Sequence, residues 1–358
     1  VNTMNHRKES FDTEYGAKAT LDAAKHSTIH VQAVHPEDNV GTNLADELTP
    51  LNYYTILSDE EPASVYTNAN LRSFRITQPL QINMENDSLH MRFYSPVCIK
   101  EVTVMAKSPT MDEYVEFVYI DNIPAFADIK TSIKVLEKGL YRTESGKIQQ
   151  LSAEEINPAS LSLKISCNDP YWTKISQIKA KWYIKFVLNG GNPVTGVPNN
   201  NWWGIRPVHC REAVALYLNI GYMCTLEKFQ QRVSTFQGTL LDNNRYPIDT
   251  STIIPKLENL SGFDIGLVYS GNGVSGLGGG RTWGVYQKSF LYHYENSGGC
   301  CSTIFHELGH CLGYNHNSTM TYGKWASGCA DVFYKNNIKD FPVNSHTILK
   351  SRSNPNIY

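Results

Sequence analysis

The chain has 358 residues, enough for two domains of ordinary size, and its 41% hydrophobic and 18% charged residues exclude an intrinsically disordered protein. The formal net charge of −2 and the lack of any cluster of lysine and arginine argue against nucleic acid as a partner. No apolar run approaches the roughly 18 residues of a membrane span, so no transmembrane segment is expected.

Residues 1–45 are polar and carry one weak helical pattern, from about Tyr15 to Lys25. We interpret this segment as an N-terminal extension, either a linker or a pro-segment. A pro-segment could cover a metal site with a cysteine or an aspartate side chain, and this segment holds no cysteine.

Residues 46–146 are predicted to form an accessory domain built of β-strands. Apolar and polar residues alternate here in short runs, as expected for strands with one buried face. The clearest runs are Leu71–Ile76, Ser88–Tyr94, Ile99–Met105 and Tyr114–Ile120. Because turns of Asn, Asp, Pro and Ser separate them, they indicate a small β-sandwich. Such a domain could bind substrate, a glycan or a surface, or serve only as a spacer.

Residues 147–358 are predicted to form a second domain that mixes strands with helices, which makes the chain α+β. The pattern predicts strands at Lys181–Leu188, Phe263–Tyr269 and Tyr286–Tyr294, and helices at about Arg211–Leu218 and Leu226–Leu241. A glycine-rich stretch, residues 271–284, lies between the last two strands. It lacks the GK[ST] ending of a phosphate-binding loop, so a nucleotide site is not expected.

The most informative stretch, residues 306–316, reads HExxHxxGxxH. His306 and His310 are four residues apart, so on a helix they share one face and can reach one metal ion. Gly313 allows the chain to leave the helix with positive φ and to bring His316 back as a third ligand. Three protein ligands and one open position are typical of a catalytic zinc site, whereas structural zinc sites have four.

This spacing is the signature of the metzincin clan of zinc peptidases, which the chain resembles. The clan also has a Met-turn below the metal, and Ser318–Tyr322 is similar to the SxMxY Met-turn of astacins and serralysins. The resemblance implies that Met320 packs under the three imidazoles. It also implies that Tyr322 helps to stabilise the oxyanion; the alternative is a tyrosine that only packs in the turn.

The chain departs from the large metzincin families in two ways. His316 and Met320 are only four residues apart, closer than in astacins and serralysins, and the residue after the third histidine, Asn317, matches none of those families. The family within the clan therefore stays open. Thermolysin-like enzymes are excluded, because they need a downstream glutamate ligand and no glutamate follows Glu307. Asp331 or Asp340 would serve in an aspartate variant, but His316 stands at the expected spacing.

The resemblance further implies a mixed twisted sheet whose edge strand lies above the substrate cleft, ahead of the zinc-binding helix. Residues 276–285 stand at that place, and we expect Gly278, Gly279, Gly280 and Arg281 to form the substrate rim. Extended substrates would pair with it through main-chain atoms. The alternative is an ordinary glycine-rich turn. His293, near the site in the sequence, is expected to be structural.

Eight cysteines without CxxC spacing argue against a second, cysteine-based zinc site. Their even number and the peptidase motif favour an extracytoplasmic protein with at least one disulfide. A bridge among the four cysteines that flank the motif could brace it: Cys300, Cys301, Cys311 and Cys329. The alternative is that they are small buried residues.

The sequence thus predicts a zinc endopeptidase with one catalytic Zn²⁺, Glu307 as general base and a protein or peptide as substrate; it makes no prediction about calcium. Two alternatives remain open. One is a catalytically silent zinc-binding adhesin that acts through the β-domain, although a silent site would not need the glutamate. The other is a zinc hydrolase that acts on a bond other than a peptide.

Overall fold

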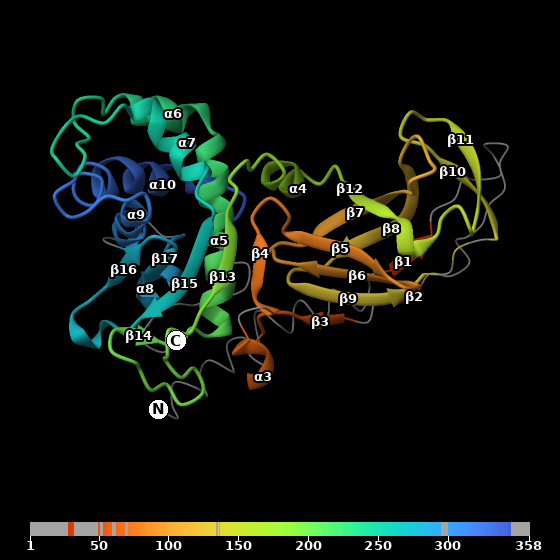
Figure 1. The fold of residues 1–358 in the computed structure, drawn as a ribbon, viewed down its shortest axis with the longest axis horizontal. Helices are drawn as coiled ribbons and strands as arrows, with labels where there is room; N and C mark the ends of the chain where they lie inside the picture. The colour runs from red at the N-terminus through yellow and green to blue at the C-terminus, as the bar shows by residue number, and fades with distance from the viewer. Residues whose placement is uncertain are drawn as a thin grey trace. The chain divides into compact units, whose positions relative to one another are not determined.

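The computed structural model describes residues 28–31, 49–50, 53–58, 62–68, 71–133, 135, 137–294 and 300–344. These residues form an α+β structure that divides into two compact units (Figure 1). The C-terminal unit takes in Leu57–Gln78 and the chain from Lys174 onward, and the β-unit takes in the described residues up to Ile56 with Pro79–Thr173. In the described part of the chain, no helix has the length and apolar character needed to cross a membrane.

The β-unit contains two antiparallel sheets and a separate hairpin. The first sheet has the order β12 (Ser162–Ser166), β7 (Ile99–Lys107), β8 (Val115–Ile123), β1 (Thr28–Val31) and β2 (Thr49–Pro50). The second has the order β3 (Tyr53–Thr55), β9 (Ala127–Ser132), β6 (Ser88–Phe93) and β5 (Leu80–Glu85), and the hairpin joins β10 (Lys138–Arg142) to β11 (Ile148–Ser152). Side chains alternate between buried and half-buried along β6, which is the pattern of a strand with one face in the core. The strands predicted at residues 88–94, 99–105 and 114–120 are thereby confirmed.

The C-terminal unit is built around a mixed sheet. Its order is β16 (Gly276–Gly279), β17 (Thr282–Val285), β15 (Gly262–Val268), β13 (Tyr183–Phe186) and β4 (Ser73–Arg75), and β14 (Trp202–Trp203) also pairs with β15. The central pairs β13–β15 and β15–β17 are parallel, whereas the outer pairs are antiparallel. β15 is a nearly continuous buried apolar run, as central parallel strands are. β16 forms one edge of this sheet.

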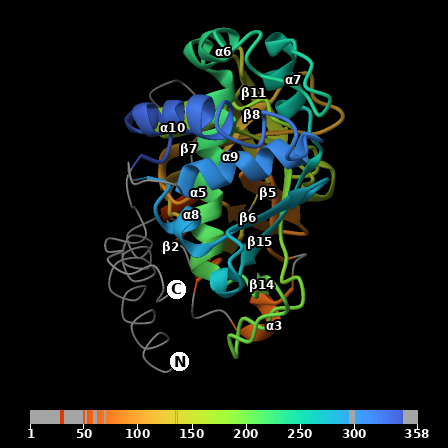
Figure 2. The same ribbon diagram turned by 90° about the vertical axis from the view of Figure 1, so that its left-hand side faces the viewer.

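Helices pack on this sheet through a buried aromatic cluster. The longer helices are α5 (Pro207–Thr225), α6 (Glu227–Ser234), α9 (Cys300–Cys311) and α10 (Asp331–Asn337). The shorter ones are α3 (Ala63–Tyr66), α4 (Pro170–Ile175, at the division between the units), α7 (Ile253–Glu258), α8 (Gln287–Leu291) and the π-helix η6 (Ala326–Ala330); 3-10 turns lie at η3 (Pro158–Ser160), η4 (Thr250–Thr252), η5 (Ser270–Asn272) and η7 (Ile338–Asp340). On β17, the Trp283 ring lies 5.1 Å from that of Tyr217 on α5, and its Nε1 donates to the main-chain oxygen of Ile304 on α9 at 3.2 Å. This one tryptophan thus ties α9 to both the sheet and α5, which α9 crosses (Figure 2).

Several predicted elements differ from the structure. The strand predicted at Tyr286–Tyr294 is wrong: five of its residues form the short helix α8. The helix predicted at Arg211–Leu218 is longer at both ends, and the one predicted at Leu226–Leu241 ends at Ser234. The helix predicted at Arg211–Leu218 is too short for a physical reason: almost every residue of α5 is buried, and a helix buried on all sides shows no apolar stripe.

Two predicted segments belong to other units than the sequence suggested. Leu71–Ile76, placed in the accessory domain, supplies β4, which pairs antiparallel with β13 in the C-terminal unit. Thr28–Val31, placed in the N-terminal extension, pairs with β8 in the β-unit. The helical pattern at residues 15–25 lies outside the described residues.

Candidate metal centre

Helix α9 and the turn after it bring the three histidines together. Ile304, Leu308 and Leu312 are buried and hold one face of α9 in the core, so that His306 and His310 lie on the other. Gly313 has φ +93° and ends the helix. The N–H of Gly313 donates to the main-chain oxygen of His310 at 2.9 Å, and the N–H of Tyr314 donates to the main-chain oxygen of Gly309 at 3.1 Å. Together these two hydrogen bonds form a Schellman motif. The turn predicted at Gly313 is thus present.

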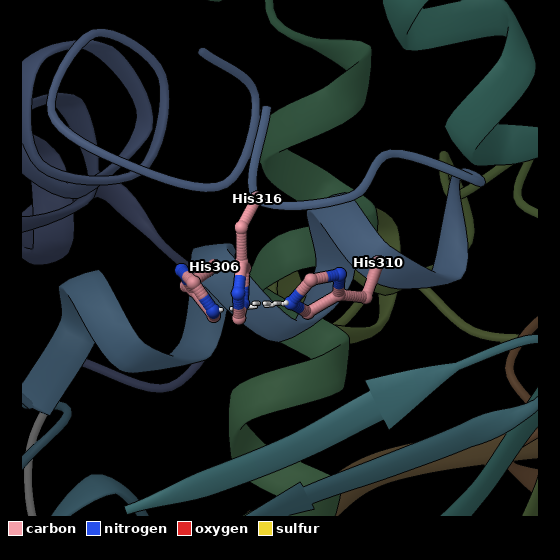
Figure 3. A group of neighbouring side chains, drawn as sticks. All are labelled: His306, His310 and His316. Carbon is pink, nitrogen blue, oxygen red and sulfur yellow. Dashed lines mark hydrogen bonds between the residues drawn. The ribbon is translucent and has the colours of Figure 1, made fainter. Parts of the chain in front are cut away.

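The Nε2 atoms of the three rings converge on one point (Figure 3). The Nε2 atom of His310 lies 3.1 Å from that of His306 and 3.0 Å from that of His316. Nδ1 of His306 faces the carbonyl oxygen of Thr321, and Nδ1 of His310 faces that of Tyr314 at 2.7 Å. Because a carbonyl only accepts, both Nδ1 atoms carry the proton and both Nε2 atoms present lone pairs.

This arrangement fits a metal ion better than it fits hydrogen bonds among the rings. Two unprotonated Nε2 atoms at 3.1 Å repel each other, and a shared cation removes that repulsion. Three nitrogens at about 2.0–2.1 Å from a tetrahedral metal would lie about 3.3 Å apart, close to the separations seen. The donated Nδ1–H groups also orient the rings, as at known histidine metal sites. His306, His310 and His316 therefore form a group that could hold a metal ion.

Glu307 lies beside this group without joining it. Its Oε1 is 3.8 Å from Nε2 of His306, and the residue is only 4% exposed. Burial raises the pKa of its carboxyl group to about 8, whereas a cation at the three imidazoles would act in the opposite direction. Its Oε2 has no hydrogen-bond partner among the described residues. A buried carboxyl group of this kind, next to a metal site, is suited to exchange protons with a bound molecule.

The segment Ser318–Tyr322 packs directly against α9. Met320 is fully buried, and its N–H donates to Ser318 Oγ, which donates in turn to the main-chain oxygen of Leu241 at 2.6 Å. A Cβ added at Gly309 would lie 2.5 Å from the main-chain oxygen of Met320, so only glycine fits at that point of the helix. The turn therefore has a fixed place against α9 and supplies the carbonyl that orients His306.

Tyr322 lies at the open side of the group. Its ring centroid is 4.7 Å from that of His306 and 5.1 Å from that of His316, and the residue is 54% exposed. The hydroxyl group can therefore reach a molecule bound at the histidines while it remains in contact with solvent.

A cavity of about 680 Å³ opens above these residues. Its walls come from α9, from residues 321–322 and 326–327, and from β16 with the residues just before it. Its lining consists of Gly273, Val274, Ser275, Gly276, Leu277, Gly278, Ser302, Thr303, His306, Glu307, His310, His316, Thr321, Tyr322, Ala326 and Ser327. Apart from Glu307, the lining has no acidic or lysine or arginine side chain, so a metal and this glutamate would dominate its electrostatics.

Of the expected rim residues, only Gly278 lines the cavity. Gly279 ends β16 with a φ of +145°, and Gly280, with a φ of +57°, begins the turn to β17. Arg281 bends back from the cavity: its Nη1 donates to Ser261 Oγ at 2.8 Å, and its Nη2 lies 3.7 Å from Asp264. These three residues shape the hairpin.

Sequence reasoning missed several lining residues. Ser302 and Thr303 precede His306 by four and three residues, so helical spacing could have placed them beside it. Ala326 and Ser327 reach the cavity from a π-helix, which has no sequence pattern. His293 is fully buried and bonds Tyr334, away from the cavity. A disulfide that could brace the motif is not formed by Cys301, Cys311 or Cys329, and the other described cysteine side chains form none either.

Comparison of the chain with known protein families, with curated proteins and with solved structures gives no match. The function therefore has to be argued from the residues and geometry of this site.

Proposed function

We propose that the protein is a zinc-dependent endopeptidase of the metzincin type. The observation that carries the proposal is the convergence of three Nε2 atoms at the base of a cavity, with a buried carboxyl group 3.8 Å from one of them. Three imidazoles and one open position are the ligand set of catalytic zinc. The resident ion would be held by His306, His310 and His316.

The chemistry divides between the ion and the chain. A zinc ion supplies Lewis acidity, which lowers the pKa of water and polarises a carbonyl group. Glu307 takes a proton from the attacking water at its carboxylate and passes it to the leaving amine. Its low exposure strengthens this exchange, because few waters compete for the carboxylate. The Tyr322 hydroxyl donates to the oxyanion as negative charge develops there.

The edge strand β16 would hold the substrate. The N–H of Tyr286 donates to the Ser275 carbonyl at 3.0 Å, so this pair is a hydrogen-bonded pair of the antiparallel ladder. Such pairs alternate with non-bonded ones, and the register places Gly276 and Gly278 in the non-bonded class. Their N–H and C=O groups therefore point away from β17, toward the free edge. An extended peptide can pair with them through its main chain.

The segment around Met320 supports the metzincin type, because Met320 is buried beside α9 and the segment supplies the carbonyl that orients His306. We further propose that the two sheets of the β-unit form an accessory β-sandwich and that the protein acts outside the cytoplasm, where an endopeptidase with an open cleft meets foreign protein. The described cysteine side chains form no disulfide and lend no support to that location.

Digestion of a mixed peptide library by the zinc-loaded protein tests the proposal. The expected result is a set of new internal cleavage sites that disappears with Glu307→Ala, although the variant still binds one zinc per chain. Glu307→Ala activity equal to wild type would refute the role of the glutamate. An uncleaved library, with zinc bound, would favour the silent binding protein, and hydrolysis of a non-peptide ester alone would favour another zinc hydrolase.

A further inference from the structure

We infer that Gly276 and Gly278 are positioning residues for Glu307, and that the lack of side chains on this face of β16 fixes the carboxyl group beside the histidines. The inference deepens the proposed function and rests on it for its kinetic part. Its structural part concerns only contacts within the chain.

Three contacts carry the inference. A Cβ added at Gly276 would overlap the Glu307 side chain, and its three nearest atoms are Oε1, Cδ and Cγ of that residue. A Cβ added at Gly278 would lie 2.6 Å from Oε2 and 2.8 Å from the main-chain oxygen of Glu307. Cβ atoms do not approach other heavy atoms this closely, so both carboxylate oxygens occupy the space that side chains on β16 would take.

The conformation of the backbone does not explain these two glycines. Positive φ accounts for Gly279 and Gly280, which turn the hairpin, but neither Gly276 nor Gly278 has a positive φ. Any residue could adopt their backbone, so the close approach of Glu307 is what excludes a Cβ. This separates the stretch GLGGG into two glycines required by a neighbour and two required by a turn.

The same two residues also face the cleft edge. Their main-chain N–H and C=O groups point toward the place proposed for the substrate, while their Cα atoms cover the carboxyl group of Glu307. A peptide paired with Gly276 and Gly278 is thereby placed in register with the proton acceptor. The glycines set the distance between the substrate main chain and Glu307.

A double-mutant cycle tests the inference without relying on activity. Gly276→Ala and Glu307→Ala are made singly and together, and the melting temperature of each zinc-loaded protein is measured. We expect Gly276→Ala to lower Tm by roughly 4–10 °C in the wild type, because the new Cβ overlaps the buried side chain of Glu307. The loss should nearly vanish in the Glu307→Ala background, because all three clashing atoms are gone. An equal loss in both backgrounds would overturn the inference.

Gly278→Ala and Gly323→Ala provide the internal comparison. Gly278 also abuts the main chain of residue 307, so its loss in Tm should be only partly relieved by Glu307→Ala. A Cβ at Gly323 meets nothing within 4 Å, so Gly323→Ala should keep Tm in both backgrounds and turnover in the otherwise wild-type chain. If Glu307→Ala fully abolished the loss in Tm caused by Gly278→Ala, or if Gly323→Ala lowered Tm, the double-mutant cycle would not report the contacts described.

Kinetics on a peptide that the wild type cleaves give the second readout. Gly276→Ala should bind one zinc and keep KM within about threefold, while kcat falls by roughly 100-fold because the proton acceptor is displaced. A purely structural glycine would change zinc content or KM together with kcat. Unchanged kcat with unchanged Tm would refute the inference. Absence of cleavage by the wild type would refute the proposed function and leave the Tm cycle intact.

Discussion

The two walls of the cavity are built by opposite means. On the wall formed by α9 and the segment after it, the chemistry lies in side chains: three imidazoles, two of which are oriented by hydrogen bonds to main-chain carbonyls, a carboxyl group and a phenol. On the wall formed by β16, two glycines leave room for Glu307 and present main-chain groups at the free edge. The difference teaches that a site can depend on residues that bring no functional group to it.

The first wall should respond most strongly to mutation. We expect His310→Ala to weaken zinc binding by more than roughly 100-fold, above the range typical for loss of a histidine's hydrogen-bond partner. His310 is the ring whose Nε2 lies near both others, so its removal leaves two separated ligands. Competition with a chelator of known zinc affinity measures the change.

The matched control for this prediction is His90→Ala, which removes a histidine held by Glu85 and Asp128 in the β-unit. It should leave zinc affinity unchanged. In addition, zinc at 100 times its Kd should stabilise the wild type by about 2.7 kcal/mol and His310→Ala much less. Equal zinc affinity of His310→Ala and wild type would show that the metal centre does not lie on the first wall.

Gly309→Ala tests whether the first wall also depends on a residue without a side chain. The new Cβ would meet the main-chain oxygen of Met320, which cannot rotate away, so we expect a loss of about 1–3 kcal/mol despite the better helix propensity of alanine. The shifted turn would also weaken the contact between Thr321 and His306, and zinc affinity should fall by roughly 10–100-fold. Urea unfolding and zinc competition measure the two effects, and wild-type values in both would show that the turn adapts.

The contrast between the walls also explains what the sequence could predict. The spacing of His306, His310 and His316 predicted α9, the turn at Gly313 and the convergence of the rings, because all of these follow from local helix geometry. The need for glycine at position 276 could not be predicted, since its constraint comes from a residue 31 positions later in the chain, on another element. The β-unit strands were visible because one face is buried, whereas α5 lacked any such asymmetry.

The prediction of short segments is less accurate for a related reason. Tyr286–Tyr294 carries too few residues for a period to be measured, and contacts with α5 and α9 determine that it forms α8. Ser73–Arg75 alternates like the strands of the β-unit, and pairing with β13 places it in the other unit. Alternation of apolar and polar residues predicts a strand, but it does not determine which strand it pairs with.

Tyr322→Phe removes the hydroxyl group of Tyr322 and keeps its ring, so it tests whether that hydroxyl takes part in the reaction. If the hydroxyl stabilises the oxyanion, kcat should fall by up to about 100-fold while zinc affinity and Tm stay as in wild type. If the ring only packs against His306 and His316, phenylalanine keeps that contact and all three values stay unchanged. Steady-state kinetics on a library-derived peptide decides between these outcomes.

The smallest effect is expected at the hairpin end of the second wall. Arg281→Ala removes a surface contact with Ser261 and Asp264, so unfolding free energy should change by no more than about 0.5 kcal/mol. Arg281 does not line the cavity, so KM and kcat should match wild type. Gly276→Ala, five residues earlier in the chain, is expected to differ from wild type in kcat. A clear rise in KM for acidic peptides would mean that the arginine reaches the substrate, and that the second wall also acts through a side chain. The rim would then extend beyond the two glycines, and its electrostatics would contribute to specificity.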